Sequence, residues 1–259
     1  MAGPEFTAAP VETVRLLPIY ILCDTSQSMQ ANGAIDKMNE GLAGVVTAIN
    51  HQGAKGDDIR LCVITYATKA TVALPLTSVE MHTTIPKLNA VGVTNLPNAI
   101  ELLSTTLSSD YHALRDAGER AYRPAVFVFT DGRPTDGQGN ELQDPSPWLG
   151  PLQTLKDHPI WAPRIYAYGF GHAQPEQLKL LVSERDVSDA VVQGRVDFTG
   201  AEAAESIGRL FPHLFKTITE AAGAAASGAS EEQIGKALDS AHADKDLGAI
   251  DPDDWWGSK

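Results

Sequence analysis

Short, continuously apolar segments alternate along this chain with segments of helical periodicity, and this alternation is the feature that most constrains its fold. Residues 17–23, 59–66, 124–130 and 164–170 are apolar almost without interruption. Such runs are typical of strands that are buried on both faces of a sheet. Between them, apolar residues recur at intervals of three and four, which predicts amphipathic helices. The sequence therefore predicts an α/β fold with a doubly wound, mainly parallel sheet of six strands and helices on both faces.

The remaining elements follow from local patterns. Residues 70–74 form a further strand after a short reversal at Thr68-Lys69, which predicts an antiparallel hairpin with 59–66 at one edge of the sheet. A short sixth strand is expected at 190–192. The expected helices begin at Ser28 and Pro97 and cover 148–155, 175–182 and 203–219.

The chain of 259 residues is long enough for one sizeable α/β domain, which we place at residues 17–220. Residues 1–16 form a leader, and its first six residues look like a vector-derived sequence. Residues 221–259 form a C-terminal tail. The tail begins with a stretch rich in Ala, Gly and Ser at 221–230, which is typical of a flexible connector, and it continues as an acidic segment with two tryptophans.

The charge and the cysteine content limit the classes of binding partner and the cellular compartment that we expect. Acidic side chains outnumber basic ones by 33 to 20, which disfavours nucleic acid and anionic membranes as partners. No apolar stretch is long enough to span a bilayer, and the N-terminus lacks the basic and apolar regions of a signal peptide. The two cysteines, Cys23 and Cys62, lie in strand-like apolar runs and form no disulfide framework. We therefore expect a cytoplasmic protein that binds another protein.

Side chains with oxygen donors occur at three of the expected element boundaries. The sequence Asp-Thr-Ser-Gln-Ser directly follows the first strand, a threonine precedes the helix that begins at Pro97, and the strand 124–130 ends in Thr-Asp-Gly. Ligands of doubly wound sheets bind at the carboxyl ends of the strands where the winding reverses, so we expect these side chains to meet there. The candidate metal ligands are Asp24, Ser26, Ser28, Thr94 and Asp131.

These five side chains make a set of oxygen donors for a hard divalent cation. We expect the hydroxyls of Ser26, Ser28 and Thr94 to bind the ion directly. Asp24 and Asp131 would bind through water or orient the hydroxyls. Neutral direct ligands leave the ion electron-poor, and an Asp or Glu of another protein is a natural further ligand. The set predicts adhesion through a hard divalent cation such as Mg²⁺ rather than catalysis.

Each position also has a simpler interpretation. Ser26 or Ser28 can cap the following helix, Thr94 can be a helix-start residue, and Asp131-Gly132 can be an ordinary turn. For these simpler interpretations to hold, three unrelated segments would have to show the pattern of a metal site by chance and in the right order. A single metal site is the more plausible explanation.

The enzymatic alternative is a phosphatase of the haloacid dehalogenase type, with Asp24 as nucleophile and Asp131 and Asp136 as distal metal ligands. That chemistry needs a second Asp two residues after the first as acid and base, and this chain has Ser26 there. Phosphate-loop and nucleophile-elbow motifs are also absent from the sequence. We expect no enzymatic activity.

The three segments resemble the metal-ion-dependent adhesion site (MIDAS) of von Willebrand factor type A (VWA) domains. In that family an Asp-x-Ser-x-Ser motif, a distant Thr and a distant Asp hold magnesium or manganese, and all five positions match here. The strings at 63–66 and 130–136 are similar to the bacterial TerY-like branch, which is associated with tellurite-resistance and stress operons. The resemblance implies a partner that offers Asp or Glu to the metal, with kinases and phosphatases of the same operon among the expected partners.

The C-terminal tail carries two further signals. Ser230 and Gln233 have the spacing of a capping box, and the apolar residues after them predict a short helix that either docks on its own domain or binds a partner. The segment 251–256, Asp-Pro-Asp-Asp-Trp-Trp, places two large aromatic residues beside acids. Such aromatics are interface anchors in many complexes, or they cover their own domain. The acids could engage a basic partner or the metal site of a neighbouring copy.

Overall fold

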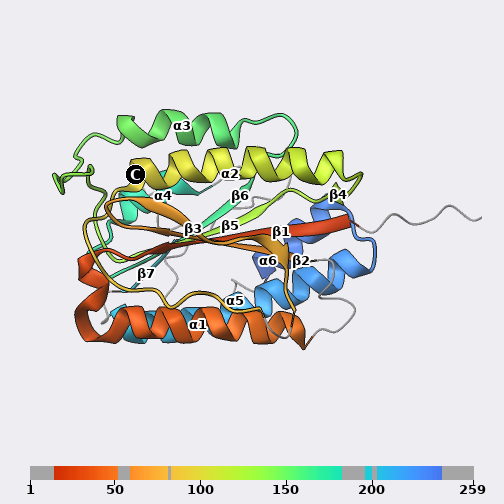
Figure 1. The fold of residues 1–259 in the computed structure, drawn as a ribbon, viewed down its shortest axis with the longest axis horizontal. Helices are drawn as coiled ribbons and strands as arrows, with labels where there is room; N and C mark the ends of the chain where they lie inside the picture. Colours follow the sequence, from red (N-terminus) through yellow and green to blue (C-terminus); the bar gives the residue numbers. More distant parts are fainter. Residues whose placement is uncertain (1–14, 52–58, 81–82, 183–195, 200–202, 241–259) are drawn as a thin grey trace, which may run out of the picture.

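The computed structural model describes residues 15–51, 59–80, 83–182, 196–199 and 203–240. Figure 1 shows a central sheet with helices on both sides. The strands are β1 Arg15–Asp24, β2 Ile59–Tyr66, β3 Ala70–Ser78, β4 Arg120–Ala121, β5 Ala125–Thr130, β6 Arg164–Phe170 and β7 Val196–Thr199. The helices are the 3₁₀ helix η1 Gln27–Gly33 and the α-helices α1 Ala34–Asn50, α2 Leu96–Asp116, α3 Ser146–Lys156, α4 Pro175–Leu181, α5 Ala203–Ala226 and α6 Glu231–Ser240.

The sheet has the predicted mainly parallel, doubly wound topology. Its strands follow the order β3-β2-β1-β5-β6-β7, and the two-residue strand β4 pairs with the start of β1 beside this path. All neighbouring pairs in that order are parallel except β2 and β3, which form the antiparallel edge hairpin that the sequence predicts. The chain adds strands to one side of β1 first and to the other side later, so the winding reverses between β1 and β5. A crevice for ligands is expected at the carboxyl ends of these two strands.

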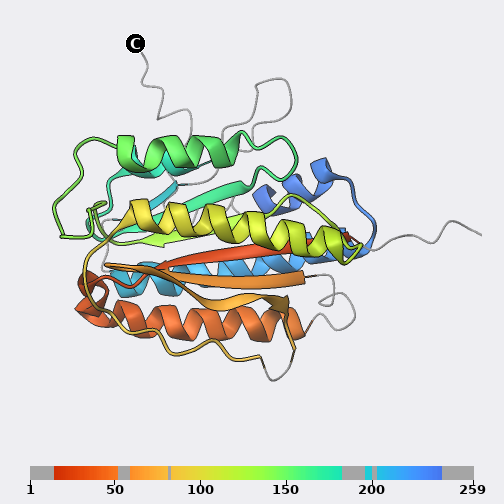
Figure 2. The same ribbon diagram turned by 45° about the horizontal axis from the view of Figure 1, so that its top comes forward.

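The strands β1, β2, β5 and β6 each contribute side chains to two separate cores, one on each face of the sheet. In β1, Ile19 and Ile21 belong to the core beneath α1 and α5, whereas Tyr20 and Leu22 belong to the core beneath α2 and α3. Figure 2 shows the sheet between these helical layers. Burial of a large apolar side chain stabilises a fold by about 1.5–3 kcal/mol, so strands covered on both faces must be apolar throughout. This explains the continuous apolar runs.

The two cysteines lie in different cores. Cys23 belongs to the core beneath α1 and α5, and Cys62 belongs to the opposite one. Both thiols are free, as predicted, and burial raises the pKa of each. They are therefore shielded by packing and held mainly as unreactive thiols.

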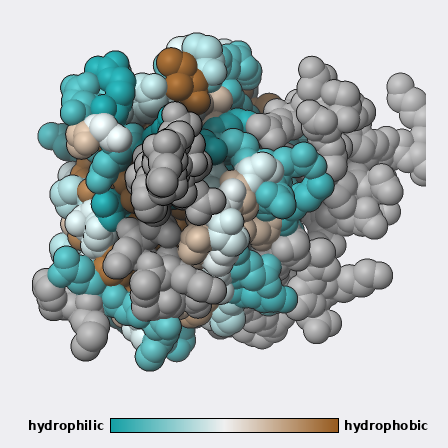
Figure 3. Space-filling model, turned by 90° about the vertical axis from the view of Figure 1, so that its right-hand side faces the viewer, coloured by the Kyte–Doolittle hydropathy of each residue, from teal (hydrophilic) through white to brown (hydrophobic). Residues whose placement is uncertain are grey.

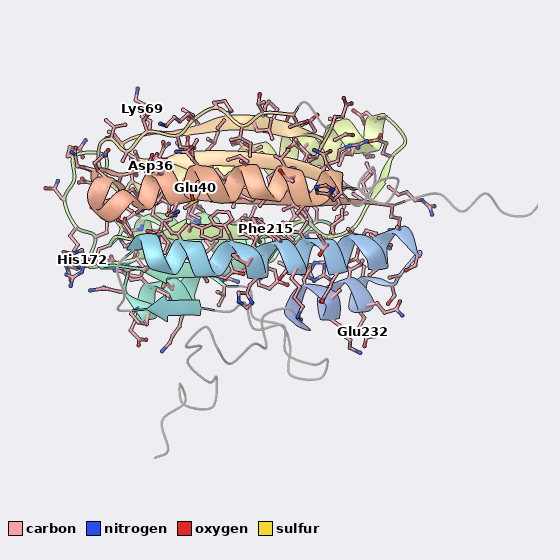
Figure 4. The ribbon with its side chains drawn as sticks, turned by 90° about the horizontal axis from the view of Figure 1, so that it is seen from below. Asp36, Glu40, Lys69, His172, Phe215 and Glu232 are labelled. Carbon is pink, nitrogen blue, oxygen red and sulfur yellow. The ribbon has the colours of Figure 1, made fainter. Side chains whose placement is uncertain are left out.

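Helices α1 and α5 approach closely because glycines of α1 leave room for phenylalanine rings of α5. A Cβ atom at Gly41 would overlap the ring of Phe211, and one at Gly44 would overlap the ring of Phe215. Figure 4 shows the two helices side by side, with Phe215 on the side of α5 that faces α1. The Phe211 ring also stacks on Phe129 of the sheet, with 5.3 Å between the ring centroids.

We therefore expect Gly41→Ala to destabilise the domain. Helix propensity favours alanine by about 1 kcal/mol, but overpacking against the buried ring of Phe211 costs about 1–3 kcal/mol. The matched control is Gly208→Ala in α5, where a Cβ would meet no atom within 4 Å. Urea unfolding should show a lower free energy of unfolding for Gly41→Ala and an equal or higher one for Gly208→Ala. Equal stabilities of the two variants would contradict this packing argument.

Two element boundaries differ from the prediction. The helix expected from Ser28 begins as the 3₁₀ helix η1, and the regular α-helix starts only after Gly33, whose φ of 73° is in the left-handed region that favours glycine. The sixth strand expected at 190–192 lies outside the described residues. The strand that pairs with β6 in the described part is β7, at Val196–Thr199.

The prediction that residues 221–230 form a flexible connector was wrong over its first six residues. Helix α5 continues to Ala226, and Ala221, Ala222 and Ala225 are buried against the core. Alanine is both a strong helix former and small enough for a close helix contact, so composition alone cannot distinguish a connector from such a helix. Gly228, two residues after the end of the helix, has a φ of 72°, and the amides of Gly228 and residue 229 bond to carbonyls of the last turn at 3.0 and 3.1 Å.

The short C-terminal helix α6 docks on its own domain. Its capping box is present, because the Gln233 side chain accepts from the Ser230 amide at 2.7 Å and the Ser230 hydroxyl accepts from the Gln233 amide at 3.2 Å. Ile234 and Leu238 are fully buried in the core beneath α1 and α5. Glu231 forms ion pairs with Arg15 at 2.9 Å and with Arg164 at 3.2 Å. Of the two alternatives for this helix, the structure selects docking in cis.

Candidate metal centre

Asp24 ends β1 with its carboxylate held from both sides. The side chain is fully buried. One carboxylate oxygen accepts from the Ser26 amide at 2.8 Å, and the other accepts from the Thr130 hydroxyl at 2.8 Å. Thr130 is the last residue of β5, which is the parallel neighbour of β1. The reversal of winding therefore places an oriented carboxylate at the predicted crevice.

A chain of hydrogen bonds links three further predicted residues. The Ser28 hydroxyl donates to Oδ1 of Asp131 at 2.7 Å, and the hydroxyls of Ser26 and Ser28 lie 2.9 Å apart. Because the single hydroxyl proton of Ser28 is directed at Asp131, Ser26 is the donor in the second bond. Ser26 and Asp131 are buried, whereas Ser28 is exposed. The hydroxyl and carboxylate oxygens therefore reach the molecular surface at Ser28.

Thr94 reaches the same place from a third segment. Its Oγ1 lies 2.9 Å from the position that a Cβ of Gly132 would take, so the side chain packs directly against the residue after Asp131. Backbone hydrogen bonds hold the loop before Thr94 to the Asp-x-Ser-x-Ser turn. The amide of Val91 donates to the carbonyl of Thr25 at 2.8 Å, and the amide of Gln27 donates to the carbonyl of Gly92 at 2.9 Å. Asn95 is the N-cap of α2 and accepts from the amide of residue 98. Thr94 is thus left available for the crevice.

The two aspartates make the site strongly favourable for a cation. Burial, followed by the charge of Asp131, raises the pKa of Asp24 to about 7, although hydrogen bonds from Ser26 and Thr130 oppose the shift. Burial also raises the pKa of Asp131, against the hydrogen bond from Ser28. Among the described residues, neither carboxylate forms an ion pair with a Lys or Arg side chain. Two buried carboxylates without such partners are costly unless a cation neutralises them.

The structure gives roles to residues that are not among the five ligands predicted from the sequence. Thr130 orients Asp24, and Gly132 provides the space that Thr94 occupies. The amide of His172 donates to the carbonyl of Asp131 at 2.8 Å, and its exposed side chain lies at the same end of the molecule (Figure 4). In the sequence, the tripeptide Thr-Asp-Gly pointed to Thr130 and Gly132 as residues near the site. Only the pairing of β1 with β5 shows that Thr130 contacts Asp24.

The loop after Asp131 lies beside the site, as its position in the sequence predicts. The amide of Thr135 donates to the Thr94 carbonyl at 2.8 Å, and Thr135 forms an isolated bridge with Glu141. Arg133 pairs with Glu141 at 2.8 Å. Asp136 is half-buried and accepts from the amides of residues 138 and 140, so it orders this loop instead of joining the cluster.

In the described part of the chain, no cluster of three or more His, Cys, Asp or Glu side chains has the arrangement of a metal site. The donor set at the crevice therefore depends on hydroxyls as much as on carboxylates. Such oxygen-only sets suit hard divalent ions rather than soft ones. Four of the predicted residues, Asp24, Ser26, Ser28 and Asp131, are linked by hydrogen bonds, and Thr94 packs against Gly132 beside them. The role of all five as metal ligands stays a prediction.

The fold and the crevice define a doubly wound α/β domain that presents acidic and hydroxyl side chains from three loops at the carboxyl ends of its strands. The sequence profile of the von Willebrand factor type A domain matches residues 19–205. The chain therefore belongs to the von Willebrand factor type A domain family. Among curated proteins, none matches this sequence.

Solved structures show the same fold at low sequence identity. A von Willebrand factor type A protein from Catenulispora acidiphila superposes with a TM-score of 0.56 at 16% identity, over 80% of this chain and 43% of the other. The pilus adhesin SpaC from Lactobacillus rhamnosus GG, in its open conformation, gives 0.59 at 15% identity, over 81% and 30%. Proximal thread matrix protein 1 from the mussel byssus, with a zinc-occupied MIDAS motif, gives 0.52 at 15% identity, over 78% and 48%. This chain thus spans less than half the length of each of these proteins.

In the segments that the structure describes, none of the helices is long and apolar enough to cross a membrane.

Proposed function

We propose that this domain is a metal-dependent protein interaction module that captures a carboxylate of its partner through a divalent cation. The observation that carries the proposal is the hydrogen-bonded group of Asp24, Ser26, Ser28 and Asp131, which joins two buried carboxylates to an exposed hydroxyl. Thr94 packs against Gly132, the residue after Asp131. Buried acids that open to solvent through hydroxyls make a site that favours a cation and leaves it accessible from outside.

The donor set fits magnesium or manganese. Ser26, Ser28 and Thr94 would hold the ion directly, while Asp24 and Asp131 would act through water or through the hydroxyls that they accept from. A bound divalent cation would offer a coordination position to an Asp or Glu of the partner. The mussel byssus protein with its zinc-occupied MIDAS motif supports the assignment of a divalent cation to this fold. The loop 133–145 borders the site and would contribute to the choice of partner.

Isothermal titration of the metal-free chain with Mg²⁺ and with Mn²⁺ tests the metal site directly. Affinity capture from cell extract, with and without chelator, then tests whether the ion recruits a partner. The proposal requires saturable binding of at least one of the two ions and a captured protein that chelator releases. Capture that persists in chelator would separate partner binding from the metal site and contradict the proposal.

We expect Thr94→Val to weaken metal binding while the domain keeps its stability. The substitution removes one hydroxyl and keeps the shape of the side chain, and the loss should be about tenfold or more. The matched control is Thr135→Val in the neighbouring loop, whose buried hydroxyl has no hydrogen-bond partner among the described residues. Titration calorimetry of both variants measures the effect. Unchanged affinity of Thr94→Val would exclude Thr94 from the ligands.

We further propose that the domain is not an enzyme. In the phosphatase alternative, the residue two positions after Asp24 must exchange protons, but Ser26 instead uses its hydroxyl in a hydrogen bond with Ser28. Asp136, the expected distal ligand of that alternative, belongs to its own exposed turn. A phosphatase assay with Mg²⁺, with Asp24→Asn as the control, would reveal activity if this assignment were wrong.

The narrower assignments remain predictions. Membership of the TerY-like branch would place the domain in a tellurite-resistance or stress system, with kinases or phosphatases of the same operon as partners. A cytoplasmic location is compatible with the free, buried thiols of Cys23 and Cys62. Identification of the captured protein by mass spectrometry tests the first assignment, and fractionation of the native cells tests the second.

A further inference from the structure

A second candidate binding site lies at the opposite end of the sheet from the metal centre. It is a cavity of about 440 Å³ at the amino ends of β1 and β4, bordered by the last turns of α2, the segment after α3 and the start of α6. Small-molecule and peptide pockets in proteins commonly have volumes of this order. Figure 3 views the molecule from this end, where hydrophilic and hydrophobic residues lie next to one another.

The floor of this cavity is aromatic. Tyr20, Tyr122 and Trp161 line it, and all three side chains are at least nine-tenths buried. At the rim, Ile160 adds an apolar side chain that is 63% exposed, although large apolar side chains are rarely so exposed in this domain. A ligand with an aromatic or other large apolar group would therefore be bound by contacts that are already in place.

The rim of the cavity is basic in an acidic protein. Four arginines line it together with two glutamates, whereas the whole chain has a formal charge of -13. The guanidinium of Arg15 lies 4.2 Å from the centroid of the Tyr122 ring. Arg115 is 56% exposed and pairs with the adjacent Asp116. Guanidinium groups above aromatic rings recognise a carboxylate that is attached to an aromatic group, because each part of such a ligand meets a complementary surface.

The chain itself contains such a sequence. Residues 251–256, which lie outside the described residues, read Asp-Pro-Asp-Asp-Trp-Trp. Glu231, the first residue of α6, lines the cavity, and the ten residues of α6 end at Ser240. A helix of that length spans about 15 Å, whereas the ten residues 241–250 span up to about 35 Å when extended. The chain is thus long enough to bring this sequence back to the cavity.

We propose that the cavity between β1, β4 and the end of α2 binds the acidic, tryptophan-containing sequence 251–256 of this chain. The arginine rim pairs with its aspartates, and the aromatic floor receives its tryptophans. This site is independent of the metal centre, which lies at the other end of the strands. The proposal gives a role to residues 251–256, which the metal-dependent function does not use.

The test uses the full chain and a fluorescently labelled peptide with the sequence of residues 251–259, followed by fluorescence anisotropy. In the double variant Trp255→Ala/Trp256→Ala the chain no longer fills its own cavity. A tethered segment competes at about millimolar effective concentration, so the double variant should bind the peptide about tenfold more tightly than the natural chain. All measurements are made both with Mg²⁺ and with EDTA.

Cavity variants of the double variant locate the bound peptide. Arg115→Glu and Ile160→Asp change exposed side chains of the rim, and each should weaken peptide binding about tenfold, as for an interface anchor. The matched control is Lys37→Glu on α1, which also reverses an exposed charge beside an acid and should leave binding unchanged. A concentration-dependent mass in light scattering that the double tryptophan variant lacks would show that copies exchange their segments, which also supports the site.

Three results would overturn the proposal. The first is equal peptide affinity of the natural chain and the double tryptophan variant. The second is binding that neither Arg115→Glu nor Ile160→Asp weakens. The third is binding that EDTA abolishes, because the acidic segment would then occupy the metal centre and not the cavity. If the proposed metal-dependent function were wrong, the expected results of the peptide assay would stay the same.

Discussion

Asp131→Asn is expected to weaken Mg²⁺ binding by about 10- to 100-fold, the range for loss of a group that orients metal ligands. The Asp131 carboxylate accepts the proton of the Ser28 hydroxyl and thereby directs the lone pairs of Ser28 toward the crevice. An amide in its place carries no charge, and its nitrogen cannot accept this bond. Asp24→Asn should have an effect of the same size, since Asp24 supplies the second buried negative charge.

The matched control for these variants is Asp136→Asn. Asp136 lies five residues after Asp131, but it is half-buried in its own loop, where it accepts hydrogen bonds from residues 138 and 140. Titration calorimetry should show near-natural Mg²⁺ affinity for this variant, and partner capture should fail only for Asp24→Asn and Asp131→Asn. Cooperative thermal unfolding of all three proteins would show that the loss is local. An equal loss for Asp136→Asn would favour the phosphatase arrangement, in which this residue is a ligand.

The metal-free domain is expected to lose stability as the pH rises from about 4 to about 7. The pKa of Asp24 is about 7 in the folded state and 3.8 for an ordinary aspartate, so the folded protein binds the extra proton throughout this interval. Stability falls with pH wherever the folded state holds more protons than the unfolded state. Each unit of pKa difference corresponds to about 1.4 kcal/mol, which gives a total of a few kcal/mol. Asp131 acts in the same direction, because its pKa is also raised.

Urea unfolding in EDTA at about pH 5 and about pH 7.5 measures this dependence. Asp24→Asn is the control, because its amide does not titrate while the other acids of the chain are retained. The difference between the natural chain and this variant isolates Asp24, because both proteins retain Asp131 and acids such as Asp136 and Glu232, whose pKa values are lowered by hydrogen bonds. Saturating Mg²⁺ should remove the difference, because a bound cation favours the ionised carboxylates. Identical pH profiles of the two proteins would contradict the electrostatic description of the site.

Local patterns were sufficient to predict most of the framework. The apolar run that becomes β1 and the helical periodicity of α1 reflect burial on the two faces of one sheet, and that requirement can be recognised in consecutive residues. The edge hairpin of β2 and β3 was recognisable for the same reason. The five residues of the crevice were predicted together because each follows a strand or precedes a helix, and the topology of a doubly wound sheet brings such boundaries to one edge.

Contacts between distant segments were not predictable in this way. Thr130 was recognisable as the end of a strand, but its bond to Asp24 depends on the pairing of β5 with β1. The alanines at 221–226 have the composition of a connector, and only their burial beside α1 shows that they belong to a helix of the domain. The basic rim of the second cavity combines Arg15 with three arginines of residues 115–123, and no local pattern joins these two parts of the chain.

The sequence by itself determined the order of strands and helices and the capping box of α6, because each depends on side chains within a few residues of one another. It also indicated the chemical nature of the candidate metal centre, because each of its three segments is a recognisable element boundary with oxygen donors. Only the tertiary structure decided that α6 docks in cis, which hydroxyl orients which carboxylate, and that a basic aromatic cavity lies at the end opposite the metal centre. The physical reason is that hydrogen bonds and burial act between atoms that are near in space. Spatial neighbours from distant segments are set by the packing of the whole sheet and its two helical layers.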